Sequence, residues 1–156
     1  IFKINKRYFI SSYRKGKINL EIKNKTILVT ASAKRLGKFI ATDLIKKGWT
    51  VAVHYNKSKT SAEETANYLF KLGGQVSTHQ ADLTCNSDIE KLVNEIEALN
   101  STWVGLINNA GYFSYDNGTN FSLEELHRHM SVNFIAPSLL TKALANYTMK
   151  IKKQKN

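Results

Sequence analysis

The stretch that most limits the folds open to this chain is residues 26–37, which read Thr-Ile-Leu-Val-Thr-Ala-Ser-Ala-Lys-Arg-Leu-Gly. The β-branched and apolar start is typical of a buried strand, and the small residues after it are typical of a tight turn. An amphipathic helical pattern follows at once. A strand, a turn and a helix in this order present backbone N–H groups and a helix N-terminus to a phosphate. The stretch therefore predicts a βα unit with an anion-binding turn.

Apolar segments that predict strands alternate with helical patterns along the rest of the chain. This alternation indicates an α/β fold, a doubly wound parallel sheet with helices on both faces. The expected strands are residues 26–30, 50–54, 76–81 and 103–107.

Helix boundaries are predicted from capping signals. Ser-x-x-Glu boxes predict helix starts at Ser61, Ser87 and Ser122, because the hydroxyl and the carboxylate can each accept a free backbone N–H. The last of these helices is long, and Pro137 is expected to bend it. The first helix spans about residues 35–47, and its apolar spacing predicts that it buries Leu36, Phe39, Ile40 and Leu44.

The net charge of +11 is concentrated at the two ends of the chain. Residues 1–25 carry eight Lys or Arg and one Glu, residues 142–156 carry five Lys and no acid, and residues 26–141 carry ten basic and eleven acidic residues. Binding of nucleic acid needs a basic face on the folded surface. The neutral body therefore predicts a protein that does not bind nucleic acid.

Cysteine and hydropathy bear on the compartment. Cys85 is the single cysteine, which fits a reducing compartment, and we expect a cytoplasmic protein. The alternative is an organelle, because the basic N-terminus is similar to a transit peptide. No apolar stretch approaches the length of a membrane-spanning helix, so no membrane association is expected. His127 and His129 diverge on a helix, and no metal site is expected.

A second signal identifies a family. Residues 106–111 read Leu-Ile-Asn-Asn-Ala-Gly, another apolar strand that ends in small polar residues. Together with residues 26–37 they resemble the short-chain dehydrogenase/reductase family, and Ala-Lys-Arg-Leu-Gly is most similar to its pteridine reductase branch. The resemblance covers about residues 25–145, about half of a family member, and stops before the last three strands. It implies a Rossmann-like sheet with strand order 3-2-1-4.

This resemblance organises the chain into three parts. Residues 1–25 are interpreted as a basic extension, residues 26–145 as a partial NADP-binding domain, and residues 146–156 as a Lys-rich tail.

The phosphate turn departs from the family pattern at two glycines. Ala31 stands where the family has its first Gly, and Arg35 replaces the middle one, as in the pteridine reductase branch. Gly37 matches the last. A methyl group at Ala31 is strained only if the backbone angle φ there is positive, so the sequence leaves open whether this turn accepts a cofactor.

The cofactor type is predicted from the end of the second strand. An NAD site needs an acid there, and this chain has none between His54 and Glu63. Lys57, Ser58 and Arg35 can instead surround a 2′-phosphate, which indicates NADP(H). The residues assigned to the cofactor from these arguments and from the resemblance are Lys34, Arg35, Leu36, Tyr55, Asn56, Lys57, Ser58, Asp82, Leu83, Asn109, Ala110 and Gly111.

The resemblance implies a hydride transfer from NADPH to a carbonyl or a pteridine ring, with Asn133 as the Asn of the catalytic tetrad. The family's Ser, Tyr and Lys would follow this helix and are absent here. Two Tyr-x-x-x-Lys strings, 13–17 and 55–59, fall in the wrong parts of the chain. We therefore expect a cofactor-binding half that does not complete the reaction alone. An inactive remnant and a non-catalytic nucleotide-binding module remain as alternatives.

The dinucleotide is the expected partner, and the incomplete sheet predicts a further one. The edge of strand 103–107 would lack a neighbour, and an open apolar edge invites pairing with another chain. We expect self-association or a complementing C-terminal half. The side chains expected to be partly uncovered are Val104, Leu106, Leu139 and Leu140.

Overall fold

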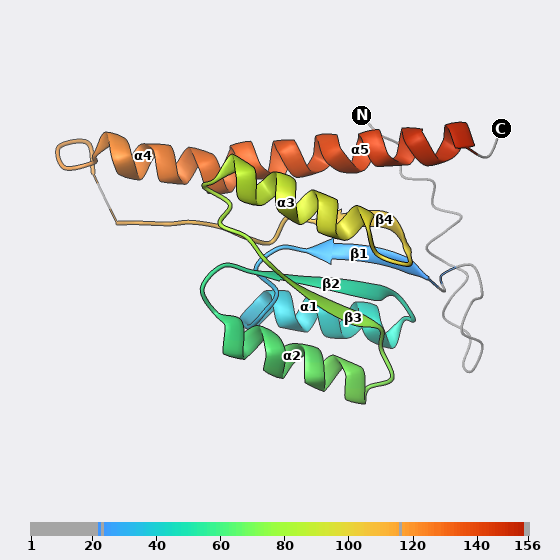
Figure 1. Ribbon diagram of the computed structural model, residues 1–156. Coiled ribbons are helices and arrows are strands. Elements are labelled where there is room, and N and C mark those ends of the chain that lie inside the picture. Colours follow the sequence, from blue (N-terminus) through green and yellow to red (C-terminus); the bar gives the residue numbers. More distant parts are fainter. Residues whose placement is uncertain (1–21, 23, 116, 155–156) are drawn as a thin grey trace.

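The computed structural model describes residues 22, 24–115 and 117–154. A four-stranded parallel sheet lies between two layers of helices (Figure 1). The strands are β1 (Lys25–Val29), β2 (Thr50–Tyr55), β3 (Val76–Gln80) and β4 (Thr102–Ile107), and the helices are α1 (Arg35–Lys46), α2 (Lys59–Lys71), α3 (Asn86–Glu97), α4 (Leu123–Met130), η2 (Ser131–Ile135) and α5 (Ala136–Gln154). The sheet order β3-β2-β1-β4 confirms the predicted fold class and strand order.

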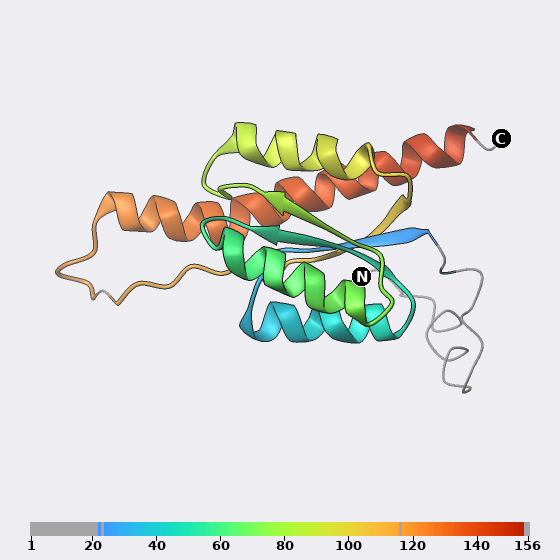
Figure 2. The same cartoon turned by 60° about the horizontal axis from the view of Figure 1, so that its bottom comes forward.

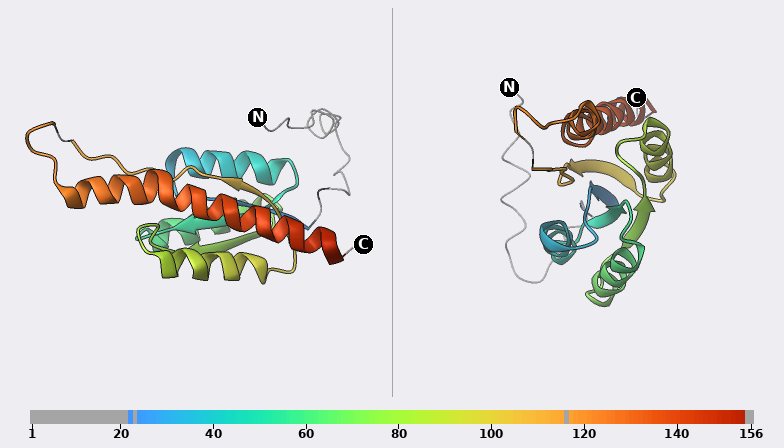
Figure 3. Two further views of the ribbon diagram at one scale, coloured as in Figure 1. Left: turned by 90° about the horizontal axis from the view of Figure 1, so that it is seen from above. Right: turned by 90° about the vertical axis from the view of Figure 1, so that its left-hand side faces the viewer.

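Each face of the sheet has its own apolar core, because successive side chains of a strand point to opposite faces. Leu28 and Ala52 are fully buried on the side covered by α3 and α5. Val29, Val51 and Val53 are fully buried on the side covered by α1 and α2. The end-on view in Figure 3 shows the helices on both sides of the sheet. The continuous apolar runs of β1 and β2 are thus explained by burial on both faces.

The predicted inner face of α1 is wrong for two residues. Leu36 and Phe39 are 64% and 72% exposed, whereas the buried residues of this helix are Gly37, Ala41 and Ile45. Small residues on the inner face let the helix approach the strand closely, and the larger apolar side chains on the first turns are turned outward. Ile40 and Leu44, also predicted as inner residues, are partly buried and pack against the core.

Two of the three predicted capping boxes are also wrong. Helix α2 begins at Lys59 after Ser58, and α3 begins at Asn86 after Cys85, so Ser61 and Ser87 lie inside helices. The third box is confirmed in part, because Ser122 Oγ accepts the backbone N–H of Glu125 at 3.1 Å. The Ser-x-x-Glu pattern also suits a first helical turn, where acidic side chains are favoured, so the pattern alone does not fix the boundary.

The last helical segment is continuous, but its middle is a π-helical turn. Helices α4, η2 and α5 follow one another along one long rod (Figure 1). Pro137, expected to bend this helix, lies in the first turn of α5 and has no N–H to donate to the carbonyl of Asn133. The π-helical turn η2 lies just before Pro137, as expected where a backbone hydrogen bond of the helix is missing.

Helix α5 also includes residues 146–154, the first part of the segment interpreted as a Lys-rich tail. The ring of Tyr147 lies 5.9 Å from that of Trp103, so this part packs on the sheet. The basic extension, residues 1–25, lies outside the described residues except for Ile22, Asn24 and Lys25. Ile22 is buried, and the carbonyl of Asn24 accepts the N–H of Thr102.

Within the described residues β4 pairs with β1 alone. Val104 is 40% exposed at this edge, as expected, and Leu106 and Leu139 are partly buried. The expectation for Leu140 is wrong, because this side chain is fully buried in the core beneath α5. None of the described helices is long and apolar enough to cross a membrane.

Candidate functional site

A cleft with a volume of about 350 Å³ opens at the carboxyl ends of the strands, past which α4 extends (Figure 2). Ligands of open α/β sheets bind at this edge, where the loops that follow neighbouring strands converge. The residues that line the cleft are Ala31, His54, Asn56, Lys57, Asp82, Leu83, Thr84, Ala110, Gly111, Tyr112, Arg128 and Val132. A slightly larger hollow of about 430 Å³ lies between the sides of α3 and α5, away from the strand ends.

The turn between β1 and α1 has an unusual backbone conformation. Ala31 has φ of 52° and Arg35 has φ of 54°, both in the left-handed region that glycine adopts without strain. These are the two positions where the sequence departs from the family's glycines. The methyl group of Ala31 is therefore attached to a residue with positive φ, the conformation in which a Cβ atom is strained.

His54 holds this turn from the side of β2. Its imidazole is buried, with an exposed fraction of 2%. Nδ1 accepts the N–H of Ala31 at 3.0 Å, and Nε2 lies 3.1 Å from the carbonyl oxygen of Ala81. A carbonyl only accepts, so the proton lies on Nε2 and the ring is neutral. Burial lowers the pKa of His54 to about 4, which keeps the ring neutral at physiological pH.

Asn109 and Thr30 hold the same turn from the side of β4. The hydroxyl oxygen of Thr30 accepts the N–H groups of Asn109 and Ala110, each at 2.9 Å. In return Asn109 Nδ2 donates to the carbonyl of Thr30 at 2.9 Å and to that of Ala31 at 3.2 Å. Both backbone groups of Ala31 are thus bound, the N–H by β2 and the carbonyl by the loop after β4.

The N-terminus of α1 is suited to an anion. Its first turn contains no acidic residue, and no described side chain caps it. Lys34 and Arg35 are exposed there, next to N–H groups that have no partner within the helix. Gly37 allows this approach, because a Cβ atom there would lie 2.5 Å from the carbonyl oxygen of Ala31. The turn therefore fits a phosphate group in both charge and shape.

Polar groups at the ends of β2 and β3 form the next part of the cleft. Asp82 accepts the backbone N–H of Thr84 at 2.9 Å and its hydroxyl at 2.8 Å. The bond from the Thr84 N–H is the largest cause of the lowered pKa of Asp82, and Asn56 and Lys57 act in the same direction. Asp82 is therefore a carboxylate that faces the cleft beside a cation.

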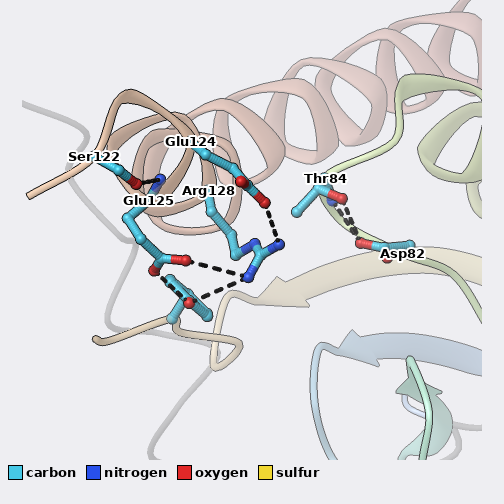
Figure 4. A network of polar contacts seen from close by, with 7 residues as sticks. Asp82, Thr84, Ser122, Glu124, Glu125 and Arg128 are labelled. Atoms are coloured by element: carbon cyan, nitrogen blue, oxygen red, sulfur yellow. Dashed lines mark hydrogen bonds and ion pairs between the residues drawn. The ribbon is translucent and has the colours of Figure 1, made fainter. Parts of the chain in front are cut away.

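The outer wall is formed by Arg128, which reaches the cleft from α4. Its guanidinium lies 3.1 Å from a Glu124 oxygen and 3.3 Å from a Glu125 oxygen. The hydroxyl of Tyr112 donates to Glu125 at 2.6 Å. Figure 4 shows Arg128 between these carboxylates, with Thr84 and Asp82 facing it across the cleft.

Asn133 lies beside the cleft, and both ends of its side chain are bound. Its Oδ1 accepts the N–H of Tyr112 at 2.7 Å, and its Nδ2 donates to the carbonyl of Tyr112 at 2.8 Å. The side chain thereby joins η2 to the loop after β4, next to Gly111.

The residues assigned from the sequence fall into two groups. Asn56, Lys57, Asp82, Leu83, Ala110 and Gly111 line the cleft together. The others surround it: Lys34, Arg35 and Leu36 form the start of α1, Tyr55 and Ser58 flank the loop after β2, and Asn109 binds the turn. Within the described residues no cluster of three or more His, Cys, Asp or Glu is arranged for a metal ion.

The sequence-based assignment leaves out six lining residues: Ala31, which was considered only as a residue of the turn, and His54, Thr84, Tyr112, Arg128 and Val132. Val132 directly precedes Asn133, and Arg128 is four residues earlier on the same helical face, so this spacing could have indicated both. For the buried contacts of His54 the sequence carries no signal.

Replacing Ala31 with Gly is expected to stabilise the chain by about 1 kcal/mol. Glycine removes the cost of positive φ, about 1–2 kcal/mol, and part of that gain is lost to the greater freedom of the unfolded chain. Urea unfolding of the variant and of the unmodified chain measures the difference. The matched control is Ala41→Gly, inside α1 and fully buried, which is expected to destabilise; stabilisation by both changes would contradict the argument.

A family model described as short chain dehydrogenase matches residues 25–156. The short-chain dehydrogenase/reductase homolog YusS of Bacillus subtilis (strain 168) is 38% identical over 91 residues, 58% of this chain and 84% of that protein. Glucose 1-dehydrogenase 2 of the same organism is 30% identical over 131 residues, 83% of this chain and 51% of that protein.

Solved structures are also similar to this chain. FolM alternative dihydrofolate reductase 1 of Brucella canis, in complex with NADP, is 32% identical with a TM-score of 0.75. The match covers 81% of this chain and 51% of that one. This chain therefore spans about half the length of the reductase and of the glucose dehydrogenase.

Proposed function

This chain belongs to the short-chain dehydrogenase family, and we propose that its cleft binds NADP(H). The observation that carries the proposal is the conformation of the β1–α1 turn, whose positive φ angles, close-packed Gly37 and uncapped helix N-terminus fit a phosphate group. The similar FolM alternative dihydrofolate reductase 1 of Brucella canis was solved in complex with NADP. The turn and the start of α1 would hold the pyrophosphate, and Asp82, Leu83 and Ala110 would line the adenosine part.

The loop after β2 supports NADP(H) over NAD(H). Asn56 and Lys57 line the cleft at the position where an NAD site places an acid on the ribose hydroxyls. Arg35, at the start of the helix that follows the neighbouring strand β1, provides a second cation. A 2′-phosphate would be bound by a point charge from Lys57 and by the planar guanidinium of Arg35.

The unmodified chain is expected to bind NADPH at least about tenfold more tightly than NADH, since hydrogen bonds between charged groups contribute about 1.5–3 kcal/mol. Replacing both Lys57 and Arg35 with Ala should remove this preference. Fluorescence titration of each cofactor measures it, with Lys46→Ala at the far end of α1 as the matched control. Equal affinities for the two cofactors in the unmodified chain would overturn the assignment.

We further propose that the whole enzyme reduces a carbonyl or a pteridine-type ring. The similarity to the Brucella canis dihydrofolate reductase supports the pteridine class. The nicotinamide would supply the hydride. Of this chain's residues, Asn133 would take part through its backbone carbonyl, because its side chain is bound to Tyr112 and Pro137 has no N–H to donate to it. That carbonyl would hold a water of the proton relay.

A further inference from the structure

We propose that His54 is a positioning residue that holds the β1–α1 turn in its phosphate-binding conformation. This proposal rests on the proposed function, which identifies the ligand that the turn binds. The imidazole itself is 2% exposed, so its action on a ligand passes through the backbone of the turn.

The geometry gives His54 two roles at once. Its side chain accepts the N–H of Ala31 at 3.0 Å, and its backbone carbonyl accepts the next N–H, that of Ser32, also at 3.0 Å. The N–H groups of Ala31 and Ser32 at the start of the turn therefore both donate to His54 of β2. The opposite ring nitrogen is fixed on Ala81, after β3, so the imidazole spans the ends of three neighbouring strands.

The strain at Ala31 explains why the turn needs these hydrogen bonds to His54. An alanine prefers negative φ, whereas the observed value is 52°. The bond from Ala31 N–H to Nδ1 is one of the contacts that oppose relaxation of the residue to negative φ; the other is the bond from Asn109 to its carbonyl. A glycine at position 31 would need less support from either side. The chain thus combines a non-glycine turn residue with a buried acceptor that fixes its amide.

Two variants of His54 separate its two nitrogens. In His54→Asn the amide oxygen occupies the place of Nδ1 and still accepts from Ala31. In His54→Gln the amide occupies the place of Nε2, reaches Ala81, and leaves the Ala31 amide without an acceptor. Both variants lose the volume of the imidazole ring. A difference between the two variants therefore reports the hydrogen bond from the Ala31 N–H.

The primary measurement is amide hydrogen exchange at Ala31 and Ser32 in the full chain without cofactor. Protection of the Ala31 amide should stay near the native level in His54→Asn and fall about tenfold in His54→Gln, the effect of losing one hydrogen bond. Protection in the core of β1, at Leu28, should be equal in both variants and serves as the folding control. Equal loss at Ala31 and Leu28, or equal protection of Ala31 in all three proteins, would overturn the proposal.

The second measurement is NADPH affinity in a double-mutant cycle. His54→Gln should weaken binding about tenfold in the native background and by less than about threefold when Ala31 is Gly, because glycine adopts positive φ without support. An equal loss in both backgrounds would refute the role of His54 in holding the strained residue. If the unmodified chain binds no NADPH while the exchange pattern is as expected, the proposed function fails and the positioning role stands.

Discussion

Lowering the pH from about 7.5 to about 4.5 is expected to remove roughly 2–3 kcal/mol of stability through His54 alone. The pKa of this residue is about 4 in the folded chain and 6.5 in the unfolded chain. Below pH 6.5 the unfolded chain therefore binds a proton that the folded chain does not. Stability is fully present above pH 6.5 and is lost as the pH falls toward 4. Urea unfolding over this pH range measures the effect.

His54→Asn is the matched control for the acid titration, because asparagine keeps an acceptor for Ala31 and does not titrate. Other groups contribute in the same direction. The lowered pKa of Asp82, caused first by its bond from the Thr84 N–H, also makes stability fall in acid. Such contributions are common to both proteins and cancel in the difference between them. Parallel stability curves for the two proteins would show that His54 does not carry the effect.

Replacing Gly37 with Ala is expected to destabilise the chain by about 3 kcal/mol and to weaken NADPH binding, because overpacking forces the backbone to shift. A Cβ atom at Gly37 would lie 2.5 Å from the Ala31 carbonyl oxygen, 2.6 Å from Ser32 Cα and 2.7 Å from Asn109 Nδ2. Two of these contacts are backbone atoms of the phosphate turn, so relief requires α1 or the turn to move. Urea unfolding measures the loss of stability.

Helix propensity acts against this loss, since alanine is favoured over glycine inside a helix by about 1 kcal/mol. The sign of the result therefore distinguishes close packing from propensity. Gly118→Ala is the matched control: its Cβ would meet nothing within 4 Å, and the change is expected to stay within about 0.5 kcal/mol. A Gly37→Ala chain as stable as the unmodified one would contradict the close approach of α1 to the turn.

The cleft residues that could be predicted are those whose position follows from chain order. Asn56 and Lys57 follow β2, Asp82 follows β3 and Gly111 follows β4. In a parallel sheet the segments after the strands meet at one edge, so their convergence needs no knowledge of side-chain packing. Arg128 and Val132 enter the cleft from a helix, so their spacing relative to Asn133 indicates them only once it is known which face of that helix meets the cleft.

Capping and burial show where local patterns fail. The Ser-x-x-Glu strings at Ser61 and Ser87 are compatible with a helix start and with a first turn. In the structure the N-caps are Ser58 and Cys85, three and two residues earlier. Leu36 and Phe39 have the spacing of an inner face, yet the close contact at Gly37 rotates the helix so that they face solvent.

The sequence by itself determined the alternation of strands and helices, the parallel sheet, its strand order through the family resemblance, and the chemistry gathered at the ends of the strands. These follow from local periodicity and chain order, which act over a few residues. Only the tertiary structure decided the backbone of the turn and the role of His54. The imidazole contacts Ala31 and Ala81, which are 23 and 27 residues away in the chain. Contacts of that separation, and the strain that they hold at Ala31, exist only when β1, β2 and β3 lie side by side.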